Sequence, residues 1–328
     1  MEKIIGIGNA LTDVLAILDN DKPLEDMQLP KGTMHFVDQE KLVKINTLLS
    51  THPVSRATGG SAGNTIKALA TLGVPCGFIG KTGPDETGRF YEESFKQKGI
   101  DTEFCHSPLP SGIAYDFVTP DGERTFCDYL GAAATLTADD LLSEMFRGYS
   151  YLYIEGYLVQ NHALIKRAIE LARLEGLQVC LDLASYNIVE QDREFFDTLV
   201  TDYVDIVFAN EEEARAFTGM APQAAIGELS KRCSIVVVKT GSKGSLIKKG
   251  ADTVSIAPCT VERVVDTTGA GDYYAAGFLY GLMRGISIAK CGKIGSLLAS
   301  YIIQEIGADL EEAKWNQIKL KIQSIIAE

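Results

Sequence analysis

The sequence lacks the features that mark several large protein classes. Its seven cysteines, at positions 76, 105, 127, 180, 233, 259 and 291, include no C-x-x-C pair, so neither a disulfide framework nor a zinc site is expected. No apolar run approaches the length that spans a bilayer, and the first run is interrupted at Asp13 before it reaches signal-peptide length. The sequence therefore predicts a cytoplasmic protein without a membrane partner.

Positive charge is also scarce. The 328 residues contain 31 Lys and Arg against 44 Asp and Glu, a net charge of −13. Nucleic acid and anionic membranes both require a basic face, so this balance argues against them and leaves a small molecule as the expected partner. A hydrophobic content of 46% is enough for one large α/β domain or two smaller ones.

Short apolar runs alternate with helical patterns along most of the chain, which predicts a doubly wound, mostly parallel sheet with helices on both faces. The predicted strands are Lys3–Gly8, Cys76–Gly80, Tyr151–Glu155, Leu177–Leu183, Ile206–Ala209 and Ile235–Lys239. The predicted helices are Ala62–Leu72, Glu86–Lys98, Asn161–Leu174, Glu211–Thr218 and Tyr273–Arg284.

Two β-rich segments, Val14–Asp38 and Phe104–Leu130, interrupt this alternation. The second contains a hairpin pattern, Ile113–Thr119 and Glu123–Tyr129 around a Pro-Asp-Gly turn. We expect the two segments to form a small sheet that covers a site, because its apolar residues would otherwise be exposed; the alternative is surface decoration. Those residues are Leu15, Ile17, Met34, Phe36, Ile113, Tyr115, Phe117 and Phe126.

The most informative stretch is Val264–Gly277, where an apolar segment leads through Gly269, Ala270 and Gly271 into a helix. Backbone N–H groups at such a turn face an anion, and the helix N-terminus adds partial positive charge. Asp272 would repel that anion, so it is better explained as the base that takes a proton from an attacking hydroxyl. The alternative is a glycine-rich loop with an acidic helix start.

A second glycine-rich turn, Gly59 to Gly63, satisfies G-x-S-x-G and raises the alternative of a hydrolase with Ser61 as nucleophile. Its context is poor, since no buried strand precedes it and only His106 and His162 follow. Asn64, by contrast, offers a donor and an acceptor that suit the hydroxyls of a neutral polyol. Asp13, just after the first strand, could accept hydroxyl hydrogen bonds in the same way.

Two further segments each have a structural and a functional interpretation. Asn210 with Glu213 three residues later is a capping-box pattern, but the same side chains could hold a hydrated Mg²⁺ near phosphate oxygens. The segment Lys239–Gly244 follows an apolar strand and contains two glycines. It is interpreted either as a hairpin turn or as a loop that lines the phosphate or ribose of a nucleotide. Gly6–Leu11 and Gly83–Phe90 imitate a dinucleotide fingerprint and a P-loop but lack required residues.

In this order, the segments resemble the ribokinase (PfkB) family of carbohydrate and nucleoside kinases over nearly the whole chain. The strongest matches are Gly59–Asn64 and Asp266–Asp272. The resemblance implies a single ribokinase-like domain, residues 1–328, with lid segments near 14–38 and 104–130, and ATP and Mg²⁺ as cofactors; a monovalent cation is a further option.

The resemblance also implies roles for individual residues. The implied catalytic residues are Asp272 as base, with Gly269, Ala270 and Gly271 as the anion hole. The implied substrate-binding residues are Asp13, Gly60, Asn64 and Glu155. The implied nucleotide-binding residues are Lys239, Thr240, Gly241, Gly244 and Thr268, and the implied metal residues are Asn210 and Glu213.

The sequence departs from the family pattern at two places. Tyr273 and Tyr274 replace a small residue and Phe, and Asp182–Tyr186 is closer to adenosine-kinase-like sequences. Arg56 and Lys67 are expected to face solvent, so no fixed cation would hold a sugar phosphate and the acceptor should be neutral.

We therefore expect a kinase that transfers the γ-phosphoryl group of ATP to a primary hydroxyl of a sugar or ribonucleoside. Phe36, Tyr115 and Phe117 favour a nucleoside if they stack on a base, and could equally be lid core. The alternatives are the Ser61 hydrolase and a kinase-like fold kept only for ligand binding. The protein is expected to be a monomer or a homodimer through the lid.

Overall fold

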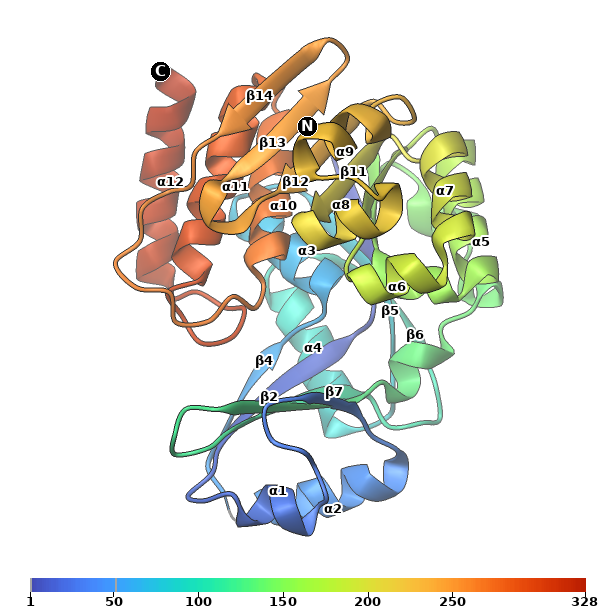
Figure 1. The fold of residues 1–328 in the computed structure, drawn as a ribbon. Helices are drawn as coiled ribbons and strands as arrows, with labels where there is room; N and C mark the ends of the chain where they lie inside the picture. The colour runs from blue at the N-terminus through green and yellow to red at the C-terminus, as the bar shows by residue number, and fades with distance from the viewer. Residues whose placement is uncertain (1, 51) are drawn as a thin grey trace.

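The computed structural model describes residues 2–50 and 52–328, which form a large and a small β-sheet (Figure 1). The large sheet has nine described strands in the order β14-β13-β12-β11-β10-β9-β1-β5-β6, parallel from β12 to β6 with an antiparallel edge at β13 and β14. Its strands are β1 (Ile4–Ile7), β5 (Cys76–Thr82), β6 (Asp101–His106), β9 (Tyr151–Glu155), β10 (Gln178–Asp182), β11 (Ile206–Asn210), β12 (Ile235–Lys239), β13 (Ser245–Lys249) and β14 (Asp252–Ile256).

The central strands are almost entirely apolar because helices cover both faces of the sheet, which confirms the predicted α/β fold. One face packs against α3 (Ser61–Thr71), α4 (Glu86–Gln97), α10 (Ala270–Leu282), α11 (Ile288–Ile302) and α12 (Glu312–Ala327). The other packs against α5 (His162–Leu174), α6 (Tyr186–Gln191), α7 (Arg193–Asp202), α8 (Glu211–Thr218) and α9 (Pro222–Leu229). Short 3₁₀ helices are η1 (Gly131–Thr135), η2 (Ala138–Asp140), η3 (Ser143–Phe146), η4 (Gly156–Gln160) and η5 (Gly241–Lys243).

The small sheet, which we call the lid, has the strand order β3-β8-β7-β2-β4. Its strands are β2 (Leu11–Ile17), β3 (Met34–Phe36), β4 (Val54–Thr58), β7 (Gly112–Val118) and β8 (Arg124–Tyr129). The predicted hairpin is confirmed, with Val118 opposite Arg124. Figure 1 shows α1 (Lys22–Asp26) and α2 (Gln39–Leu49) on the outer face of the lid, and that face has its own core, which includes Val14, Ile45 and Phe117.

The lid differs from the sequence prediction in three ways. Val14–Asp38 contains helix α1 besides its strands, and Phe104 lies in β6 of the large sheet. The edge strand β4 was not predicted as part of the lid, because its polar residues are mostly exposed. Finally, Ile17, Met34 and Phe36 are 62%, 53% and 68% exposed, so the expectation that they would be buried is wrong.

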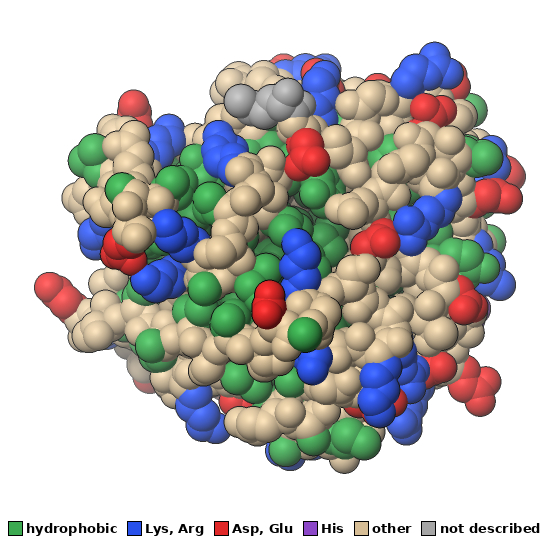
Figure 2. Space-filling view, turned by 90° about the horizontal axis from the view of Figure 1, so that it is seen from above, with side chains coloured by type: hydrophobic (Ala, Val, Ile, Leu, Met, Phe, Trp, Pro, Cys, Tyr) green, Lys and Arg blue, Asp and Glu red, His purple; other side chains and the backbone are tan. Residues whose placement is uncertain are grey.

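Charge is spread over the surface without a large block of one sign on the face seen from above. Figure 2 shows this face, at the end of the molecule away from the lid, with Lys and Arg side chains interspersed with Asp and Glu. Within residues 2–50 and 52–328, no helix is long and apolar enough to cross a membrane.

Candidate active site

Polar side chains gather where the central parallel strands end. Glu155, Asp182, Asn210 and Lys239 are the last residues of β9, β10, β11 and β12, which are consecutive neighbours in the sheet. Because parallel strands end at the same edge, these four side chains emerge together, in the position where open α/β sheets bind their ligands. The strand-end position is the sequence signal that could have identified Asp182, which the sequence analysis did not include among the site residues.

Asp272 lies in the first turn of α10 and is held by two side chains from α3. Ser61 Oγ donates to Asp272 Oδ1 at 2.7 Å, and Asn64 Nδ2 donates to Oδ2 at 3.0 Å. Burial raises the pKa of Asp272 to about 6, against the opposing effect of the Asn64 and Ser61 hydrogen bonds. A carboxylate with a pKa near neutrality is well suited to accept a proton.

The hydrolase interpretation of Ser61 is wrong. Its hydroxyl donates to a carboxylate rather than to an imidazole, and the two histidines that follow it in the sequence are engaged elsewhere. His106 Nδ1 lies 3.6 Å from Glu92, and His162 Nε2 lies 3.0 Å from Asp192. Ser61 therefore has no histidine base positioned by its own hydrogen bond.

The turn before α10 brings the backbone close to two neighbours. Gly269 has φ 75°, and a Cβ there would lie 2.8 Å from the Ala308 Cβ, so a side chain would be strained and crowded. A Cβ on Gly271 would lie 3.0 Å from Lys239 Nζ, which places a cation beside the start of the helix. The Ala270 N–H donates to the Thr267 carbonyl at 3.2 Å. The helix start and Lys239 together provide positive potential next to Asp272.

Lys239 links this turn to the strand ends. Its Nζ donates to Asp182 Oδ2 at 2.9 Å. Burial works to lower the pKa of Lys239, but Asp182 and Glu213 outweigh it and the pKa is raised, so the side chain is a cation. A buried ammonium at this point can contact a phosphate oxygen if it shifts away from Asp182.

Asn210 and Glu213 form the capping box of α8. Asn210 N donates to Glu213 Oε2 at 2.7 Å, and Glu213 N donates to Asn210 Oδ1 at 2.8 Å. Burial raises the pKa of Glu213 to about 7. Within residues 2–50 and 52–328 there is no group of three His, Cys, Asp or Glu that could hold a metal ion. The hard oxygen atoms present fit Mg²⁺ only if the ion keeps most of its waters.

Asp13 and Asn64, two of the expected substrate residues, have oxygen atoms without donors. Burial raises the pKa of Asp13 to about 7, opposed by Lys67, and no hydrogen bond to its carboxylate occurs among the described residues. Asn64 is 5% exposed, and its Oδ1 likewise lacks a partner among them. Gly60 (φ 79°) passes so close to the Asn9 carbonyl that a Cβ would lie 2.3 Å from the oxygen.

The Glu155 carboxylate accepts hydrogen bonds from other groups of the protein. Its Oε1 accepts hydrogen bonds from Asn9 N and Nδ2 at 2.8 and 2.6 Å, and its Oε2 accepts from Ala62 N at 3.0 Å. Burial raises its pKa to about 7, against these bonds. The side chain thus fixes the start of α3, and with it Ser61 and Asn64.

Lys67 does not face solvent, contrary to the sequence-based expectation. Its side chain is buried and Nζ donates to the Thr58 carbonyl, whereas Arg56 is exposed as expected and pairs with Glu86. Burial lowers the pKa of Lys67, while the nearby Asp309 and Asp13 act in the opposite direction. The substrate side of the site therefore contains a buried lysine that the helical pattern did not reveal.

An ion pair joins the lid to the loop that precedes α10. Arg124 of β8 reaches Asp266 Oδ2 from Nη1 at 2.6 Å and also pairs with Asp116 of β7. Asp266 in turn accepts from Thr268 N, Thr268 Oγ1 and Gly307 N. Thr268, expected to bind nucleotide, is thus engaged with Asp266. Tyr115 and Phe117 lie in the lid core, so they cannot stack on a substrate base.

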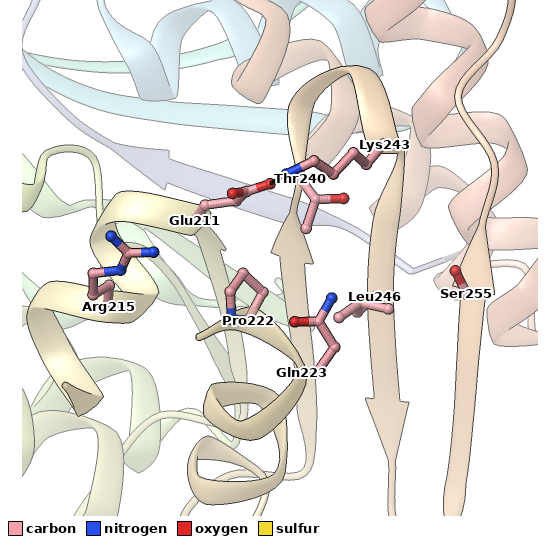
Figure 3. A pocket seen from close by; sticks show the side chains of 8 residues that line it. All are labelled: Glu211, Arg215, Pro222, Gln223, Thr240, Lys243, Leu246 and Ser255. Carbon is pink, nitrogen blue, oxygen red and sulfur yellow. Dashed lines mark ion pairs between the residues drawn. The ribbon is translucent and has the colours of Figure 1, made fainter. Parts of the chain in front are cut away.

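The Thr240–Gly244 turn borders a cavity of about 240 Å³. Figure 3 shows that the cavity lies between α8, α9 and the β12–β13 hairpin, where Lys243 approaches Glu211 at 3.5 Å. Of the predicted nucleotide residues, only Thr240 lines it. Lys239 and Gly241 to Gly244 belong to the same turn, but Lys239 points to the Asp272 side.

Comparisons with known proteins identify relatives of this chain. The family model described as "pfkB family carbohydrate kinase" matches residues 34–315. An uncharacterized sugar kinase of Archaeoglobus fulgidus is 31% identical over 73% of this chain and 96% of its own length. A 5-dehydro-2-deoxygluconokinase of Geobacillus thermodenitrificans is 28% identical over 83% and 86%. The crystal structure of adenosine kinase from Sinorhizobium meliloti superposes with a TM-score of 0.85 at 32% identity, covering 98% of this chain and 99% of that one.

Proposed function

The chain belongs to the pfkB family of carbohydrate kinases, and on that premise we propose that it transfers the γ-phosphoryl group of ATP to a primary hydroxyl of a neutral sugar or ribonucleoside. The observation that supports this most strongly is the Asp272 carboxylate, held by Ser61 and Asn64 beside the glycine-rich start of α10. A protein that only bound phosphate would gain nothing from a carboxylate at that position.

In the proposed reaction, the acceptor hydroxyl lies against Asp272 and its oxygen attacks the γ-phosphorus. Asp272 takes the hydroxyl proton as the new P–O bond forms and the bond to the ADP oxygen breaks. The N–H groups of Gly269 and Gly271 would face the charge that develops on the transferred group, with the Lys239 ammonium beside Gly271, and the Ala270 N–H would join them once it is released from the Thr267 carbonyl. Asp13 and Asn64 orient the acceptor through its hydroxyl groups.

The family uses ATP, and we propose that Mg²⁺ accompanies it. Asn210 and Glu213 would hold the ion through water, and its charge would neutralise phosphate oxygens of ATP. Thr240, Gly241, Gly244 and Thr268 are proposed to line the nucleotide. A monovalent-cation requirement and assembly through the lid stay predictions, to be checked by activity in potassium-free buffer and by light scattering.

The relatives differ in their acceptors, so the acceptor of this chain has to be measured. The experiment is a screen of ribonucleosides, neutral sugars, sugar acids and sugar phosphates for ATP-dependent phosphorylation, detected as ADP release. Asp272→Asn should lower kcat by roughly 10² to 10⁴-fold with little change in ATP affinity, the scale of general-base removal.

Near-wild-type turnover by folded Asp272→Asn would contradict the assignment of the base. A wild-type protein that binds ATP and acceptor but phosphorylates neither a sugar nor a nucleoside would favour the ligand-binding alternative.

A further inference from the structure

One carboxylate of the lid has no part in the mechanism above. Asp128 in β8 is half-buried, and within residues 2–50 and 52–328 it has neither a hydrogen-bond nor an ion-pair partner for its side chain. Burial alone raises its pKa to about 6. Shielding a carboxylate from water without a donor is unfavourable, so the free protein gains no stability from this residue.

The strand register places Asp128 beside Asp13 on one face of the lid. Asp13 pairs with Ala114 of β7, and Ala114 pairs with Asp128 of β8, so the three residues form a row across three strands. Paired residues in a sheet point to the same face, and the neighbours of Asp128, Cys127 and Tyr129, point to the lid core.

That face is turned toward the catalytic edge of the large sheet. Arg124, four residues before Asp128 on the same strand face, reaches Asp266 in the loop before α10. The carboxylates of Asp128, Asp116 and Asp272 all raise the pKa of Asp13, which means that they share its surroundings. Asp128 therefore faces the acceptor site.

The acceptor site thus presents three groups with oxygen atoms that have no donor among residues 2–50 and 52–328: the carboxylates of Asp13 and Asp128, and the Asn64 side-chain amide. Asn64 is 5% exposed, and its Nδ2 donates to Asp272. This hydrogen bond fixes the orientation of the amide and therefore of the unpaired Oδ1. Asp13 and Asp128 are two strands apart, about 10 Å between backbones. Asp128 is therefore positioned to contact a part of the acceptor distant from the one that Asp13 contacts.

We propose that Asp128 determines acceptor specificity by accepting a hydrogen bond from a neutral donor or a cationic group at the far end of the acceptor, away from the phosphorylated hydroxyl. The same carboxylate rejects acceptors with a carboxylate at that end. This inference rests on the proposed function and narrows its substrate class to polyols, amino sugars or nucleosides with a distal donor, excluding sugar acids.

The test uses acceptors that differ at one group. Glucamine, sorbitol and gluconate share a six-carbon chain with a free primary hydroxyl and end in an ammonium, a hydroxyl and a carboxylate; adenosine and inosine exchange an amino donor for a carbonyl. Wild-type kcat/KM, or affinity by calorimetry without ATP, should favour glucamine over gluconate and adenosine over inosine by about 10 to 100-fold each. In Asp128→Asn, both preference ratios should fall most of the way to 1. Asp19→Asn, a control substitution at an exposed aspartate, should leave both ratios unchanged.

The proposal would be overturned if the wild type used gluconate as well as or better than glucamine, or inosine as well as or better than adenosine. It would also be overturned if the wild type failed to bind glucamine and adenosine. Ratios that survive in Asp128→Asn with its fold verified by circular dichroism would overturn it as well. Binding ratios that follow the prediction without any phosphoryl transfer would contradict the proposed function and support the role of Asp128.

Discussion

At the residue level, Ser61 is not a nucleophile with a histidine base but a hydrogen-bond donor to Asp272, the proposed base. Its hydrogen bond stabilises the charged form of Asp272 and so lowers a pKa that burial raises to about 6. Ser61→Ala should therefore raise that pKa, moving the acidic limb of the kcat/KM–pH profile upward by about one unit while most activity at pH 8 is kept.

The matched control for this profile is Ser324→Ala, an exposed serine of α12. It should reproduce the wild-type limb. An unshifted limb in Ser61→Ala would mean that another group, such as Asp13 or Asp128, limits activity in acid.

Lys67 and Arg56 show that the solvent exposure of a single residue could not always be predicted from the sequence. Both flank the same glycine-rich turn in sequence, yet Arg56 is exposed on an edge strand and Lys67 is buried. Which side of α3 is covered depends on β4 and α10, which come from other parts of the chain. Likewise, the Asn64–Asp272 hydrogen bond joins residues 208 positions apart, and no local spacing indicates it.

At the element level, the Arg124–Asp266 pair links β8 of the lid to the loop that precedes α10. Arg124→Met removes that link, so hydrogen exchange in β7 and β8 should become faster in the free protein. If the lid closes over the acceptor, as we propose, adding the acceptor should slow exchange in the lid of the wild type. Mass spectrometry of the exchanged peptides measures both effects.

Arg147→Met provides the control, since Arg147 is an exposed arginine outside the lid. Its exchange should match the wild type. Equal exchange rates in Arg124→Met and wild type would show that the ion pair does not hold the lid.

Elements that are buried on both faces were predicted best. β12 spans Ile235–Lys239 as expected, because consecutive β-branched residues fit a covered parallel strand. The lid was predicted less well, since its strands bury only one face and three of the five residues of β4 are exposed. The start of α10 at Ala270 rather than Tyr273 reflects glycines whose low helix propensity hides the first turn.

At the level of the whole molecule, buried carboxylates should make the free protein less stable as pH rises. The pKa values of Asp13 and Glu155 are about 7 and that of Asp128 is about 6 when folded, all above ordinary values near 4. The folded state therefore binds more protons than the unfolded state between pH 5 and 7. The associated stability is full below about pH 4 and is lost as pH rises through 6 to 7.

Thermal melts without ligand should show a lower Tm at pH 7.5 than at pH 5.5, by about 1.5 °C for each kcal/mol lost. Asp128→Asn should reduce this decline, because it removes one of the groups responsible, while Asp19→Asn should melt like the wild type. A Tm that rises over this interval would contradict the assignment of the raised pKa values.

The strand order of the large sheet also has a consequence for biosynthesis. β1 is central, yet its two neighbours, β5 and β9, are encoded about 70 and 145 residues later. A nascent chain that has not reached Tyr151 leaves one edge of this apolar strand without its hydrogen-bonding partner, and contacts of such long separation form slowly. Chains that end before β9 would therefore expose an unpaired, apolar strand edge. Such edges bind chaperones and promote aggregation.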